Sequence, residues 1–322
     1  MDSNKLLNLR EIEKETLANR LVTVKDSKKI KKLLKNRFFP LNEYQKVSRN
    51  NLNTLKKGKK FNKLSKKEEQ YYEFLYDFLF KIDTNIVEIA KGLKQLIGKK
   101  NLMPSIFLLR GMMEIIFFNI FVTMKCFLNI KKNNADVLID TILRASLASD
   151  VDGIKQDYLK SESAIYKKII TNYKGRRIHI NDCIRFYKKN LVCKIFKFEE
   201  NNKSKIYQDL NKKIKPKKND EIYNMIYSII TDEDLSKITN ETILKTYDRM
   251  CEIIHPTAIK IYDATDEKIQ YDFREFYLTL IDSPLFLTNL YTMYYKEFIC
   301  DWFLENKNLF IDAFNKKLNK VL

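Results

Sequence analysis

Apolar side chains recur every three or four residues along most of the chain, which is the spacing of one face of an α-helix. The clearest run begins after Ser65 and Glu68, whose S-x-x-E spacing is that of an N-terminal capping box. We predict a helix from there to about Ile97, and a short helix over residues 1–24. Other helices are predicted over residues 102–130, 134–148, 160–174, 180–196, 203–214, 219–231, 233–254 and 284–319. Residues 256–283 fit either a short hairpin or a further helix.

Residues that begin or end helices are placed consistently with this pattern. Polar residues that favour the N-cap position stand near the predicted helix starts, namely Asn133, Asn181, Thr231 and Asn240. Other turn-forming residues are scarce, because the 322 residues include only 6 glycines and 5 prolines. That number is too small for a many-stranded sandwich or barrel. No glycine lies in a G-x-G-x-x-G or P-loop frame, so the glycine-rich nucleotide-binding motifs are excluded.

The composition predicts a folded, all-α protein. Hydrophobic residues make up 45% of the chain and aromatic residues 12%, which is more than a disordered chain carries. A chain of this length can also bury a sizeable core. We therefore predict a helical bundle over residues 65–322, with additional helices and an aromatic-rich C-terminal helix. A basic N-terminal extension, over residues 1–64, precedes it.

Positive charge is concentrated in two blocks of the chain. Residues 25–67 carry 16 basic and 2 acidic side chains, and residues 167–218 carry 17 basic and 4 acidic ones, whereas the rest of the chain is net acidic. Two basic blocks on an acidic body indicate a surface that attracts a polyanion such as RNA, although lysine-rich solvated faces give the same pattern. The candidate nucleic-acid-binding residues are Lys56, Lys57, Lys59, Lys60, Arg176 and Arg177.

Cysteine usage and the N-terminal segment favour a cytoplasmic protein. The five cysteines are widely spaced, with no C-x-x-C pair and no cysteine–histidine pair at zinc-finger distance. This is typical of a reducing compartment, and we predict no metal and no other cofactor. The first 15 residues are polar and charged, unlike a secretory signal peptide.

The segment 102–130 is long and apolar enough to raise the question of a membrane span. Its middle carries Arg110, Glu114, Asn119 and Lys125, and charges near the centre of a bilayer are costly. A buried helix is therefore favoured over a membrane span.

The best candidate for chemistry is a polar stripe at the end of the predicted helix 233–254. Residues three, four and seven positions apart share a helix face, so Asp248, Glu252 and His255 can line one stripe, with Arg249 beside it. Cleavage of a phosphodiester needs a group that moves protons and a cation that stabilises charge on the phosphate, and His255 and Arg249 supply both. The alternative is a helix-end histidine with ordinary solvated charges.

The residues from Arg249 to His255 fit the R-x(4–6)-H signature, and His255 is followed by Pro256. In this the chain resembles the HEPN superfamily, all-helical proteins of which many are metal-independent ribonucleases of toxin, abortive-infection and antiviral systems. The likeness spans about residues 65–260 and includes an R-x-x-x-E helix with Arg110 and Glu114. It implies that His255 is the acid/base, that Arg249 contacts the phosphate, and that two protomers form one RNA cleft.

Two features of this motif region leave alternatives open. Many active members of the superfamily have a polar residue directly after the arginine, where this chain has Met250, and Asp248 stands on the other side instead. Arg110 and Glu114 either support the motif, as we expect for Asp248 and Glu252, or form a buried ion pair within their own helix.

The resemblance implies a metal-independent endoribonuclease that acts as a toxin-type effector of antiphage or abortive-infection defence. Its expected partners are RNA, either tRNA or mRNA, a second copy of the chain, and an antitoxin or another protein of a defence operon. One alternative is a non-catalytic nucleic-acid-binding or scaffold subunit. A second is a membrane-associated effector that inserts the segment 102–130.

Overall fold

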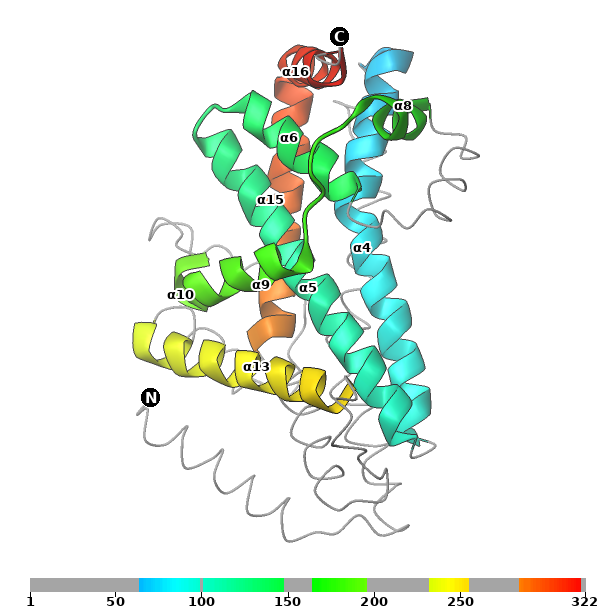
Figure 1. Cartoon of the computed structure of the whole chain (residues 1–322). Helices are drawn as coiled ribbons and strands as arrows, with labels where there is room; N and C mark the ends of the chain where they lie inside the picture. The colour runs from blue at the N-terminus through cyan, green and yellow to red at the C-terminus, as the bar shows by residue number, and fades with distance from the viewer. Residues whose placement is uncertain (1–63, 99–100, 148–163, 196–231, 255–283, 320–322) are drawn as a thin grey trace, which may run out of the picture. The chain divides into compact units, whose positions relative to one another are not determined.

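The computed structural model describes residues 64–98, 101–147, 164–195, 232–254 and 284–319 (Figure 1). Of these residues 89% are helical and none is in a strand, which confirms the predicted all-α fold. The helices are α4 (Lys66–Gly98), α5 (Leu102–Lys131), α6 (Ala135–Ser146), α8 (Ala164–Asn172), α9 (Ile180–Lys189), α10 (Val192–Ile195), α13 (Glu233–Ile254), α15 (Pro284–Glu305) and α16 (Lys307–Asn319). The predicted extension before residue 64 and the region 256–283 lie outside the described residues.

The capping box predicted at the start of α4 is confirmed. The Ser65 amide donates to Glu68 Oε2 at 2.7 Å, and the Glu68 amide donates to Ser65 Oγ at 3.4 Å. Lys307, at the start of α16, pairs with the same carboxylate at 2.8 Å. The hydrogen bonds from Lys307 and Ser65 hold the pKa of Glu68 at about 2. The capping carboxylate thus joins the first turns of two helices.

Several predicted helix boundaries are wrong. The predicted helix 180–196 is divided into α9 and α10, and Asn240, predicted as a cap, lies inside α13. Asn134, rather than Asn133, caps α6, because the Asn134 side chain accepts a hydrogen bond from the Val137 amide. Asn133 has a positive φ of 52° and precedes the cap. His179, rather than Asn181, caps α9 in a capping box with Asp182. The single helix predicted over 284–319 is broken at Asn306 into α15 and α16.

The described residues fall into two compact units, which are considered separately. The first unit contains residues 88–113 of α4 and α5, α10 and α13, and the second contains residues 64–87, 114–190 and 287–319, apart from the gaps stated above. In the first unit α10 packs on α13. The Cys193 amide donates to Ser236 Oγ at 2.9 Å, and Lys194 pairs with Glu233 at 2.7 Å.

The second unit has an aromatic core where α16 meets α4. The Tyr71 ring lies edge-on to Phe314 at 5.2 Å between centroids, and Phe310 lies edge-on to Phe303 at 4.9 Å. Such edge-to-face pairs add to the free energy gained by burying the rings. The helix α16 also packs against α6 and α8.

A polar centre lies inside the same unit. Lys296 of α15 and Asp83 of α4 form an ion pair of 2.9 Å in which both side chains are completely buried. Asn119 of α5 donates to Asp83 Oδ1 at 3.2 Å and to Asn289 Oδ1 at 2.6 Å, and the Lys296 ammonium lies 5.6 Å from the centroid of the Phe80 ring. Burial lowers the pKa of Lys296, while the nearby carboxylate of Asp83 opposes that shift. This centre fixes three helices relative to one another.

We predict that Lys296→Met lowers the free energy of unfolding by about 3–5 kcal/mol, because it leaves the Asp83 carboxylate buried without a cation. The double variant Asp83→Asn/Lys296→Met removes both charges and keeps an acceptor for Asn119, so it should recover more than half of the loss. Urea denaturation followed by far-ultraviolet circular dichroism measures both. A single variant as stable as the wild-type protein would contradict the role of the pair.

Candidate functional site

The last turn of α13 carries the described part of the predicted catalytic motif. Arg249 Nη1 donates to Glu252 Oε2 at 2.8 Å. The Arg249 side chain is 24% exposed and that of Glu252 is 61% exposed. The guanidinium is thus held by a carboxylate on its own helix while part of it stays open to solvent. Asp248 is exposed as well, so the predicted supporting residues Asp248 and Glu252 both face solvent.

Met250, which follows Arg249, has an exposed fraction of 0%. Successive residues of an α-helix are turned by about 100°, so a neighbour of a partly exposed residue readily faces inward. Ile253 and Ile254 are buried on the same helix. The position directly after Arg249 is therefore a core position in this protein.

The other half of the motif is not among the described residues. His255 and the four lysines of the N-terminal extension, Lys56, Lys57, Lys59 and Lys60, all lie outside the described ranges. The pairing of His255 with Arg249, and the role of these lysines, stay predictions.

Arg110 and Glu114 are both partly exposed on α5, one turn apart. The Nε of Arg110 is nevertheless buried, and an ion pair between the two side chains stays a prediction. The buried positions of this turn are apolar, since Leu109, Met112 and Met113 are within 2% of complete burial. A supporting role for the two charged residues stays a prediction.

The predicted RNA-binding residues Arg176 and Arg177 lie in the loop between α8 and α9. Residues 174–177 (Lys174, Gly175, Arg176 and Arg177), which we call the basic loop, are all exposed. Tyr173 and Ile178, on either side of them, are buried. The loop is therefore anchored at both ends and presents three cationic side chains in between.

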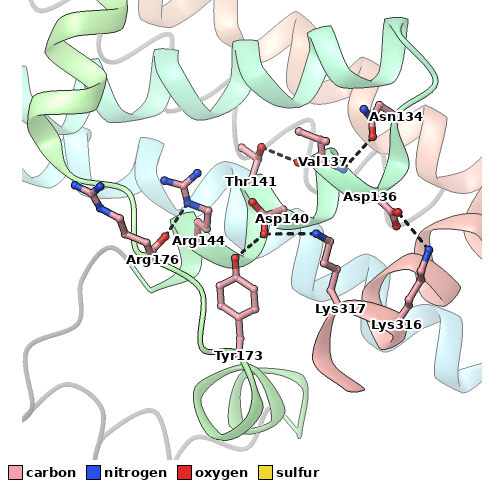
Figure 2. Close-up of polar contacts among 10 residues, drawn as sticks. All are labelled: Asn134, Asp136, Val137, Asp140, Thr141, Arg144, Tyr173, Arg176, Lys316 and Lys317. Atoms are coloured by element: carbon pink, nitrogen blue, oxygen red, sulfur yellow. Dashed lines mark hydrogen bonds and ion pairs between the residues drawn. The ribbon is translucent and has the colours of Figure 1, made fainter. Parts of the chain in front are cut away.

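Contacts with α6 hold this loop in place (Figure 2). Arg144 Nε donates to the Arg176 carbonyl at 2.7 Å, and the Ile178 amide donates to the Arg144 carbonyl at 3.3 Å. The Tyr173 hydroxyl donates to Asp140 Oδ1 at 2.7 Å. Burial and this hydrogen bond raise the pKa of Tyr173, so the hydroxyl keeps its proton. Arg144 and Asp140 are not predicted from the sequence, since Arg144 lies 32 residues before its loop partner.

Gly175 is required by the same arrangement. A Cβ atom at this position would overlap the Cζ and the hydroxyl oxygen of Tyr173. The ring cannot retreat easily because its hydroxyl is bound to Asp140. Glycine therefore allows the ring to cover the loop backbone, which is a close approach that a side chain would prevent.

Acidic side chains of α6 are already paired with lysines of α16. Lys316 lies 3.3 Å from Asp136, and Lys317 lies 3.8 Å from Asp140 (Figure 2). Within the described part of the chain, neither Arg144 nor Arg176 has a carboxylate at ion-pair distance. These two arginines thus form a locally uncompensated positive surface.

A second set of cations is interleaved with aromatic rings on the C-terminal half of α5. Lys125 lies 5.9 Å from the centroid of Phe121 and 5.7 Å from that of Phe186. Lys131 lies 5.7 Å from Phe127 and 5.4 Å from Phe298. The sequence hides this interleaving because Phe186 and Phe298 come from α9 and α15.

Two further features bear on cofactors and on the membrane question. The residues that the structure describes contain no group of three or more histidine, cysteine or acidic side chains that could hold a metal ion.

Among the described helices, α5 is long and apolar enough to cross a membrane, and 56% of its most apolar window is buried within the protein. A mostly buried core helix meets the same criterion, so location in the cell stays a prediction.

The described residues define an all-α protein. No family model matches the sequence, and no curated protein and no solved structure matches it either. The resemblance to the HEPN superfamily therefore continues to depend on the motif residues themselves.

We predict that Met250→Asn lowers the free energy of unfolding by about 2–4 kcal/mol, because it places an amide without a partner in the core and removes apolar contacts. Met250→Leu, which nearly keeps volume and polarity, should cost less than about 1.5 kcal/mol. Urea denaturation of the two variants gives the comparison. Equal stability of both would show that position 250 is not part of the core.

Proposed function

We propose that this protein is a metal-independent endoribonuclease of the HEPN type that acts as a toxin-type effector in antiphage or abortive-infection defence. The observation that carries the proposal is the position and exposure of the Arg249 side chain. Its guanidinium is positioned by Glu252 at 2.8 Å, on the last turn of the helix that leads to His255 and Pro256, and it stays partly exposed.

In this proposal His255 removes the proton of the ribose 2′-hydroxyl and returns a proton to the leaving 5′-oxygen. Arg249 stabilises the negative charge that develops on the phosphate, which a guanidinium does through two parallel hydrogen bonds. Glu252 restricts the orientation of Arg249 before RNA binds. The products carry 2′,3′-cyclic phosphate ends. RNA and a second copy of the chain are the proposed partners, with an antitoxin or another defence protein as a third.

A non-catalytic nucleic-acid-binding subunit is the second candidate, and the burial of Met250 favours it. This chain lacks the exposed polar residue that follows the arginine in many active HEPN proteins. The basic loop would still bind phosphates. Salt-sensitive RNA binding without any cleavage product, in every condition tried, would select this candidate.

The test is RNA cleavage by purified Arg249→Ala and His255→Ala proteins in the presence of EDTA. Each variant should cleave at least about 100-fold more slowly than the wild-type protein, since loss of an acid/base group or of a phosphate-stabilising cation has effects of that size. Analysis of the RNA ends should find cyclic phosphates with the wild-type protein.

Lys245→Ala is the matched control, since Lys245 is an exposed cation one turn before Arg249 on α13. It should cleave at the wild-type rate. Cleavage that persists in both motif variants would remove Arg249 and His255 from the mechanism. Loss of wild-type cleavage in EDTA would instead overturn the proposed metal independence.

A further inference from the structure

We infer that the basic loop and Arg144 form a preorganised grip for the phosphate backbone of RNA, with Arg144, Tyr173 and Gly175 as its positioning residues. The inference rests on the proposed RNA substrate and deepens it, because it assigns a binding element and a mode of recognition. It concerns the second unit, whereas Arg249 belongs to the first. Binding and cleavage can therefore be tested with separate substitutions.

The first argument is that the loop is already ordered. Three hydrogen bonds connect it to α6, from Arg144 Nε at 2.7 Å, from the Tyr173 hydroxyl at 2.7 Å and from the Ile178 amide at 3.3 Å. Ordering a loop upon binding reduces affinity, so a loop that is fixed beforehand binds more tightly for the same contacts. The fixed backbone holds the Arg176 carbonyl against the Arg144 side chain.

The second argument is electrostatic. The Nε of Arg144 is used to bind the Arg176 carbonyl, which leaves its two terminal nitrogens as donors. In Figure 2 the Arg144 side chain reaches the Arg176 carbonyl, and the Arg176 side chain extends from the loop away from the Tyr173 ring. Neither guanidinium has a carboxylate at ion-pair distance within the described residues, so a bound anion would supply a counter-charge to this surface. The planar fork of arginine also fits phosphate oxygens in pairs.

The chemistry of the loop favours a nucleic-acid backbone over a membrane. The apolar side chains at its ends, Tyr173 and Ile178, are buried and so are not available to insert between lipids. Membrane-binding elements combine basic residues with exposed apolar ones. The exposed positions 174–177 also offer no aromatic ring for base stacking. We therefore expect contacts to phosphates, with little preference for base sequence.

The experiment measures binding of a fluorescein-labelled single-stranded RNA by anisotropy at several salt concentrations. All variants are full-length and carry His255→Ala, so that cleavage does not interfere. Arg176→Ala/Arg177→Ala should weaken binding at least 10-fold. It should also reduce the slope of log Kd against log salt concentration by about 1.4, since each phosphate contact on a single strand contributes about 0.7. Lys237→Ala/Lys245→Ala removes two exposed cations of α13 and should change Kd less than 3-fold.

Two variants that keep the net charge test preorganisation. Gly175→Ala displaces the Tyr173 ring, and Arg144→Lys removes the fork that holds the Arg176 carbonyl. Each should weaken RNA binding 3-fold to 10-fold. Arg144→Lys should leave the urea midpoint of unfolding close to that of the parent protein, whereas Gly175→Ala, which displaces a buried ring, should lower it. A diffuse cloud of positive charge would be insensitive to both substitutions, so unchanged RNA binding in both would overturn the proposed preorganisation.

Three other outcomes test the grip, its ligand and the proposed nuclease separately. Arg176→Ala/Arg177→Ala protein that binds RNA as well as the Lys237→Ala/Lys245→Ala control would overturn the grip. Binding to vesicles of phosphatidylcholine and phosphatidylserine that depends on Arg176 and Arg177, without RNA binding, would overturn RNA as the ligand. RNA binding that depends on the loop, in a wild-type protein that never cleaves, would support the grip and overturn the proposed nuclease.

Discussion

The second unit depends on the placement of one buried charge, the ammonium of Lys296. An isolated ammonium inside the core would be strongly unfavourable, so the helices must meet where Asp83 lies 2.9 Å away and Asn119 binds the same carboxylate. Apolar contacts alone tolerate small shifts of one helix along another, whereas this network requires one register of α4, α5 and α15. Because only Asn306 separates α15 from α16, the position of α15 also determines where α16 begins.

The position of α16 in turn shapes the surface of α6. Lys316 and Lys317 pair with Asp136 and Asp140, which compensates the two carboxylates of α6 with cations from the C-terminal helix. Asp140 also accepts from Tyr173, so it serves the loop and α16 together. No carboxylate of α6 is then at ion-pair distance from Arg144, whose side chain holds the loop backbone instead. Among the described residues, the two carboxylates of α6 are thus paired with α16, and Arg144 is left without one of them as a partner.

Local patterns predict the capping box at Ser65 and most of the described helices, because both depend on residues within one or two turns, but they miss the breaks that divide the predicted helices 180–196 and 284–319. The cap at Asn134 is missed by one position, since two adjacent asparagines are equivalent in sequence and backbone φ distinguishes them. Arg176 and Arg177 are conspicuous as a basic run, but the residues that hold them come from another helix. Gly175 is explained by a ring two residues away whose position depends on Asp140. Such contacts between elements have no local signal.

The two groups of functional candidates differ in how the fold constrains them. Arg249 is oriented by Glu252, three residues along its own helix, so that pair can form wherever α13 is helical. The basic loop requires α6, α8 and α9 to be packed together, because Arg144 and Asp140 lie on α6 while Tyr173 follows α8. A substitution that loosens this packing should therefore disturb the proposed grip before it disturbs the Arg249–Glu252 pair. Local geometry suffices for the proposed chemistry at Arg249, whereas the proposed binding surface needs the tertiary fold.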